Sequence, residues 1–191
     1  MAPDKYTAQP FVAGTPQAEV AGQTVLAFSE NLEADRIREL LPKHGLGDID
    51  PEAWYPHQYW MNVLKEINDT MDNPTSVFVA FGKKVVETAV MPPEIQTPED
   101  VLAMLHAIHH ANLRNIPEDE GYAVEQIGTG HYHVYENTPN PSDAIYGFLW
   151  GLMQRFTKDN EDFIIIPLDN PHPDDKPGTL FEVKWGPQGT L

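Results

Sequence analysis

Residues 132–156 read YHVYENTPNPSDAIYGFLWGLMQRF. The pattern predicts a strand, then a turn rich in proline and asparagine, then a helix over about 143–157 that is apolar on almost every side. A helix without a polar face has to be buried all round, so we expect it to be the central helix of the domain. Gly147 and Gly151 share one side of this helix and permit another backbone or a ligand to approach closely.

The segments before this stretch carry apolar residues at helical spacing. They predict helices over the ranges 32–41, 51–67, 76–90 and 98–113. Pro51 and Pro98 suit the first turns of the second and the fourth, because proline fits the start of a helix. Residues 23–29 fit either a strand or the start of a helix.

The spacing changes from about residue 122 onward. Loose alternation on both sides of Gly128 and Gly130 predicts a hairpin. Two more strands are expected after the central helix, over 163–166 and 180–185. Together these segments predict an α+β fold with an antiparallel sheet of about four strands packed with several helices.

Residues 1–20 differ in composition from the rest. They are rich in proline, alanine, glutamine, threonine and glycine and show no apolar period. We therefore expect a mobile N-terminal arm that is dispensable for folding, followed by a single ligand-binding domain over residues 21–191.

Composition excludes several classes of partner and site. The formal net charge of -17 comes from 29 acidic and 12 basic residues, so phosphate backbones and anionic membranes should repel the chain. The absence of cysteine excludes disulfides, thiolate zinc sites and cysteine nucleophiles. We expect no nucleic-acid binding, no membrane span and a cytoplasmic location.

Histidines form two groups in the sequence. His106, His109 and His110 lie on the predicted fourth helix, and the first and last of these are one turn apart, as zinc ligands often are. His131 and His133 share one face of a predicted strand, and both groups would join if the hairpin packed against the helix. The alternative is solvated imidazoles on a helix and a strand, which we favour, so no metal site is predicted.

Aromatic and cationic residues suggest a ligand pocket. Trp54, Tyr59 and Trp60 can form apolar walls with polar tips, or simply belong to the core. His110 and Arg114 follow on another helix. Arg114 can hold a ligand carboxylate, or it can pair with one of the acids at 118–120.

Three stretches resemble one family. NTPNPSDAIYG at 137–147 is similar to the Asn-Pro-Tyr-Pro-Cys-Asp turn of 4-vinyl-reductase-like hydrocarbon-binding domains, which leads into a helix containing glycine. HANLR at 110–114 and WYPHQYW at 54–60 are similar to segments of a bacterial subgroup, and the resemblance spans roughly residues 23–186. These domains share a fold with subunits of the TRAPP trafficking complex and, more distantly, with haem nitric-oxide-binding domains.

The resemblance implies an apolar cavity for a small molecule or acyl chain, and no enzymatic activity. Ser142 stands where the family has cysteine, so its thiolate metal site is not available here. The related haem domains hold the propionates with a Tyr-x-Ser-x-Arg segment, and this chain has none.

We therefore expect non-enzymatic binding or sensing of a small apolar or amphipathic molecule, without catalytic residues or a cofactor. The cavity is predicted between the aromatic helix, the central helix and the sheet. Its expected lining is Trp54, Tyr59, Trp60, His110, Arg114, Tyr146, Gly147, Trp150 and Gly151. Two alternatives remain open: a dimeric interaction protein whose core is filled by its own side chains, and a metal or haem sensor that uses His106 or His110.

Overall fold

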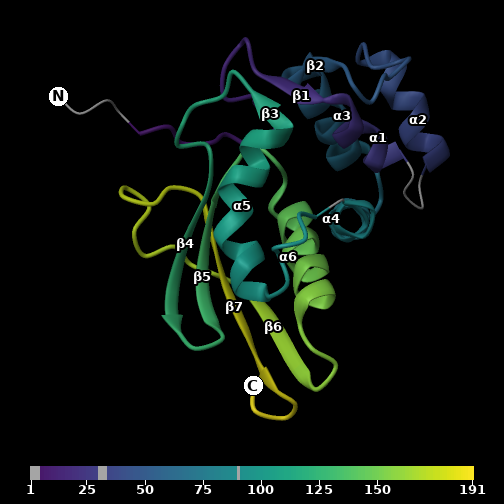
Figure 1. The fold of residues 1–191 in the computed structure, drawn as a ribbon. Coiled ribbons are helices and arrows are strands. Elements are labelled where there is room, and N and C mark those ends of the chain that lie inside the picture. The colour runs from purple at the N-terminus through teal and green to yellow at the C-terminus, as the bar shows by residue number, and fades with distance from the viewer. Residues whose placement is uncertain (1–4, 30–33, 90) are drawn as a thin grey trace.

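The computed structural model describes residues 5–29, 34–89 and 91–191. Short strands and helices form the N-terminal part: β1 (Glu19–Ala21), α1 (Gly22–Ser29), α2 (Ala34–Lys43), β2 (Trp54–Pro56), α3 (His57–Thr70) and α4 (Pro74–Thr88). The C-terminal part contains α5 (Pro98–Asn112), β3 (Leu113–Arg114), β4 (Gly121–Gly128), β5 (His131–Asn137), α6 (Ser142–Phe156), β6 (Glu161–Leu168) and β7 (Thr179–Pro187). Figure 1 shows helices gathered on one side of a twisted sheet.

The larger sheet has four antiparallel strands in the order β4-β5-β7-β6. Alternate residues of β5 and β7, among them Val134, Phe181 and Val183, are buried in one apolar cluster with side chains of α5 and α6. This architecture confirms the predicted α+β fold. The pairing of β5 with β7 lies outside the hairpin pattern, because α6 and β6 separate the two strands in sequence.

The smaller sheet has the order β2-β1-β3 and was not predicted. Its strands are two or three residues long, too short for an alternating pattern to be visible. The predicted start of a helix at Pro51 is wrong, because Tyr55 pairs with Val20 in this sheet and the helix begins only at His57. Trp54 therefore belongs to a strand.

Side-chain caps mark the starts of α4 and α5, and Pro98 stands in the first turn of α5 as predicted. Thr97 and Asp100 form a capping box before α5, and Asn73 caps α4 by accepting a hydrogen bond from the Ser76 backbone N–H. The first predicted helix is confirmed as α2, although its start at residue 32 lies outside the described residues.

Helix α6 is confirmed as a buried central element. Leu149, Leu152 and Met153 are fully buried, and α6 packs on both the sheet and α4. The contact with α4 is very close: a Cβ added to Gly147 would overlap the carbonyl oxygen of Val79, and one added to Gly82 would overlap that of Ala144. Glycine in both helices thus allows their backbones to approach each other.

The N-terminal residues from 5 to 18 form an extended arm along the body. The backbone N–H of Tyr6 donates to Asp119 (2.8 Å), and that of Ala8 donates to the side chain of Asn137 (2.9 Å). The predicted boundary at residue 20 falls within β1 (Glu19–Ala21), and the division of the chain there stays a prediction. Whether the arm moves in solution, and whether residues 21–191 behave as one domain, stay predictions.

Within residues 5–29, 34–89 and 91–191, no helix has both the length and the apolar character needed to cross a bilayer.

Candidate functional site

The structure distributes the predicted ligand residues over several places. Trp54 and Arg114 lie together on the small sheet, with the guanidinium carbon 4.7 Å from the centre of the indole ring. Arg114 Nε donates to Glu19 (2.6 Å), and not to the acids at 118–120, because β1 and β3 are neighbouring strands. Arg114 is therefore held by a residue that its local sequence does not contain.

The other aromatic residues of the prediction also lie apart from one another. Trp60 is only 2 % exposed and sits inside the N-terminal apolar cluster, whereas Tyr59 is 43 % exposed and points away from it. Trp150 and Tyr146 lie at the edge of the other cluster, and the Lys83 ammonium covers the Trp150 ring at 3.3 Å. These side chains do not share one pocket.

The expected groove beside the α6 glycines is filled. Helix α4 occupies the space next to Gly147, and Val86 Cβ would lie 3.1 Å from a Cβ on Gly151. The sequence left open whether a backbone or a ligand makes the close approach, and the structure shows a backbone. A phenylalanine at Gly147 would therefore displace α4 and disturb the fold.

The histidines of α5 gather beside residues 120–122, with ring centres of His106 and His110 4.4 Å apart, but they differ in burial. His109 is 8 % exposed and faces the body, whereas His106 and His110 lie toward the β4 strand and the loop before it. His131 and His133 alternate with Tyr132 and Val134, whose side chains are buried on the helix side of the sheet. The strand histidines thus occupy the opposite face, and a joint site with the α5 histidines is ruled out.

A buried polar cluster surrounds His109. Its Nε2 lies 3.2 Å from Glu120 Oε1, and Glu120 is fully buried. His57 at the start of α3 is 1 % exposed, and burial together with the charge of His109 lowers its pKa to about 3. Among the described residues, His57 Nδ1 and Glu120 Oε2 have no hydrogen-bond partner. The cluster closes under the N-terminal arm, where burial raises the pKa of Tyr6 and the charge of Glu120 adds to the effect.

A second buried carboxyl lies at the end of β5. Glu136 is 3 % exposed, and its carboxylate accepts hydrogen bonds from the backbone N–H (2.8 Å) and the hydroxyl of Thr138. Burial raises the pKa of Glu136 to about 7 even though these hydrogen bonds act in the other direction. Glu136 therefore titrates near neutral pH.

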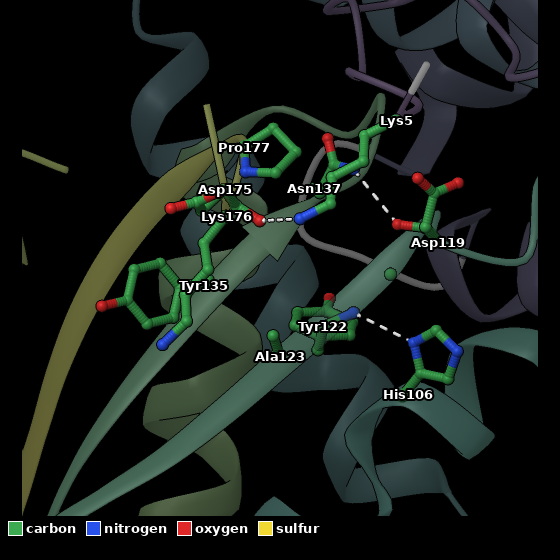
Figure 2. A pocket seen from close by; sticks show the side chains of 11 residues that line it. Lys5, His106, Asp119, Tyr122, Ala123, Tyr135, Asn137, Asp175, Lys176 and Pro177 are labelled. Atoms are coloured by element: carbon green, nitrogen blue, oxygen red, sulfur yellow. Dashed lines mark hydrogen bonds between the residues drawn. The ribbon is translucent and has the colours of Figure 1, made fainter. Parts of the chain in front are cut away.

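Two hollows adjoin one another beside His106 and Tyr122. The helix–sheet groove, about 470 Å³, runs between α5 and strands β4 and β5, with Leu102, Val124 and Tyr132 among its walls. The arm pocket, about 250 Å³, lies at the end of the same strands and is shown in Figure 2. The backbone N–H of Tyr122 points to His106 Nδ1 at 3.4 Å, on the boundary between the two hollows.

Several of these residues could not be selected from the sequence. Glu120 and Glu136 are two acids among 29, and only the fold shows that they are buried. Tyr122 and Tyr132 carried a signal, because they lie on the alternating strands that the sequence predicts. His109 was recognised as a candidate, but its inward direction was not.

Comparison with known proteins gives a likeness in structure. No protein-family model matches the chain. No curated protein matches it in sequence either. An H-NOX protein from S. oneidensis in the Fe(II)NO ligation state superposes with a TM-score of 0.63 at 14 % identity, over 87 % of this chain and 99 % of that chain. An oxygen-binding H-NOX domain related to soluble guanylate cyclases gives a TM-score of 0.58 at 13 % identity, over 89 % and 95 %.

A third structure agrees with these two. The Fe(II) unliganded H-NOX protein from K. algicida gives a TM-score of 0.53 at 15 % identity, over 90 % of this chain and 99 % of that chain. The chain therefore has the fold of H-NOX domains along most of its length. The predicted relationship to haem nitric-oxide-binding domains is confirmed at the level of the fold.

Proposed function

We propose that this chain is a small-molecule-binding sensor module whose guest occupies the helix–sheet groove. The observation that carries the proposal is the groove itself, about 470 Å³ in volume, which lies within the usual range for small-molecule sites. Its apolar walls include Leu102, Val124 and Tyr132, and Glu99 and Gln126 stand at its polar rim. Such a lining suits an amphipathic guest with an apolar body.

His106 supplies a polar group where the groove meets the arm pocket. Burial and the charges of His110 and His109 lower the pKa of His106, so its ring is neutral at pH 7. A neutral imidazole can exchange a hydrogen bond with an uncharged polar atom of the guest. The 4-vinyl-reductase-like resemblance supports a guest of this kind, since it implies a small apolar or amphipathic molecule.

Haem is the second candidate, and the H-NOX structures favour it because several of them are haem proteins by description. His109 is the α5 histidine that faces the body, where an iron ligand would have to stand. The other residues do not fit a haem. Glu120 already engages His109, and Leu102 and Leu105 fill the inner face of α5 with 1 % exposure each.

The acidic group at the end of β5 also opposes haem. The buried ionisable group there is the carboxyl of Glu136, and haem propionates need cations or hydrogen-bond donors. We therefore derive no haem chemistry for this chain.

An interaction protein remains the candidate from another class. The observation that favours it is the filled space beside Gly147, where α4 takes the place of a ligand. Such a protein would bind no apolar probe in the groove, and size-exclusion chromatography would show a dimer.

The test uses an uncharged apolar fluorescent probe, Nile red, and two matched strand substitutions. Val124→Trp should fill the groove and weaken probe binding by about tenfold or more, ~1.4 kcal/mol. Ile166→Trp places the same side chain at an exposed position on the other face of the sheet and should leave binding unchanged. Circular dichroism checks that both variants fold.

The outcomes separate the candidates. Equal loss of probe binding in both variants, or no loss in either, would contradict the proposal that the guest binds in the helix–sheet groove. A Soret band on titration with hemin that disappears in His109→Ala would replace the proposal with haem binding. Absence of probe binding together with a dimer would support the interaction protein.

A further inference from the structure

Three metal-binding side chains meet on the sheet face that is turned away from the helices. His131 and His133 project from β5 on that face, since the residues that alternate with them are buried under α5 and α6. Glu182 of β7 is the direct cross-strand partner of His133. Side chains directly opposite each other in an antiparallel pair are close neighbours, so the register alone brings the three together.

The ligand atoms already lie within reach of one ion. One nitrogen from each histidine and one carboxylate oxygen of Glu182 are all within 4.8 Å of one another. His131 Nε2 is 2.9 Å from Glu182 Oε1. Zinc ligands at about 2.0–2.2 Å from the metal stand roughly 3.4 Å apart in a tetrahedron, so small rotations of side chains would suffice.

We propose that His131, His133 and Glu182 form a binding site for a divalent zinc-class metal ion. Two imidazoles and one carboxylate are a zinc ligand set, and three protein ligands leave a fourth position open for water or another molecule. The site is independent of the helix–sheet groove, because it lies on the opposite face of the sheet.

Charged residues around the three ligands can raise or lower the affinity of the site for a metal ion. Glu125 of β4 is the cross-strand partner of His133 on its other side, and it adds negative charge near the ion. Lys184 Nζ lies 2.8 Å from Glu182 Oε1 and competes with a metal for that carboxylate.

The ordinary alternative is a cross-strand pair without a metal. The His131–Glu182 hydrogen bond would then simply link the diagonal neighbours of β5 and β7 and stabilise the sheet. The two explanations differ in the role of His133, which has no part in that pair but is needed as the third ligand.

The test is calorimetric titration of zinc chloride into the full chain without a histidine tag. One zinc per chain is expected. His133→Ala and Glu182→Gln should each weaken binding by about tenfold or more, by analogy with the loss on removing groups that support metal ligands. The double variant His106→Ala/His110→Ala removes histidines outside the site and should bind zinc like the natural chain.

A gain-of-affinity variant keeps the test independent of folding defects. Lys184→Met removes the competing ammonium and should tighten zinc binding by up to about fivefold, the size expected from one weak ion pair. Cobalt(II) titration adds a spectroscopic readout, since a site with few ligands gives visible absorption that His133→Ala should abolish. Zinc binding that is unchanged in His133→Ala, or that is lost only in the α5 double variant, would overturn the proposal.

Discussion

At the scale of single residues, His57 and Glu136 are buried with pKa shifts that affect stability in opposite ways. Burial lowers the pKa of His57 to about 3, whereas an unfolded histidine titrates near about 6.5. Burial raises the pKa of Glu136 to about 7, whereas an unfolded glutamate titrates near about 4.3. Both groups lie on the helix side of the sheet, at the ends of α3 and β5.

The histidine makes the protein sensitive to acid. Between pH 6.5 and 3 the unfolded chain binds a proton at His57 that the folded chain does not, so stability falls as pH falls through this window. His57→Leu should remove this dependence. Its free energy of unfolding relative to the natural chain should grow by up to about 1.4 kcal/mol for each pH unit below 6.5. Urea unfolding of both chains at pH 7, 5 and 4 measures this difference in the free energy of unfolding. A difference that is constant with pH would mean that His57 takes up its proton in the folded chain as it does in the unfolded chain.

The glutamate acts in the other direction. Between pH 4.3 and 7 the folded chain keeps a proton on Glu136 that the unfolded chain has lost, so stability falls as pH rises to about 7. Glu136→Gln keeps the shape and removes the titration. Its free energy of unfolding relative to the natural chain should increase from pH 4.5 to 7.5, with about 3 kcal/mol as the upper bound. The same urea series shows whether the two variants change with opposite sign.

At the scale of elements, the sequence predicts helices better than contacts between them. Helix α6 could be located because apolar residues occupy all its sides, and α5 because a capping box and a proline mark its start. The small sheet could not, since each of its strands depends on partners from another part of the chain. For the same reason the sequence showed a close approach at Gly147 but not that α4 makes it.

The packing of α4 on α6 gives a prediction with a matched control. Gly147→Ala places a Cβ against the α4 backbone, which cannot rotate away as a side chain can, so we expect a loss of about 1–3 kcal/mol. Gly47→Ala adds the same methyl group where the nearest atom is 3.8 Å distant, and it should be nearly neutral. Thermal unfolding of the two variants compares them directly. Equal stability would show that α4 and α6 separate more easily than their contact indicates.

At the scale of the whole molecule, the arm joins parts of the fold that are distant in sequence. The Phe11 backbone N–H donates to Pro139 O (2.8 Å), and Thr15 Oγ1 donates to Asn115 O (2.6 Å). Gly14 passes directly over the buried Glu120, where a Cβ would overlap the carboxylate. These contacts could not be predicted from the sequence, because the arm is held by single hydrogen bonds to scattered residues and not by an apolar stripe.

The expectation that the arm is dispensable should therefore fail in experiment. A chain that begins at Glu19 keeps β1 but loses the hydrogen bonds of the arm, each worth about 1 kcal/mol, and uncovers Glu120 and His57. With ~2–4 °C per kcal/mol for a chain of this size, the melting temperature should fall by roughly 5–15 °C. Asn137→Ala is the matched point variant, because Asn137 bonds both Ala8 and Tyr6, and it should reproduce part of the loss at full length. If the truncated chain had the same melting temperature as the full chain, these contacts would not stabilise the fold. The arm would then be dispensable, as its composition predicts.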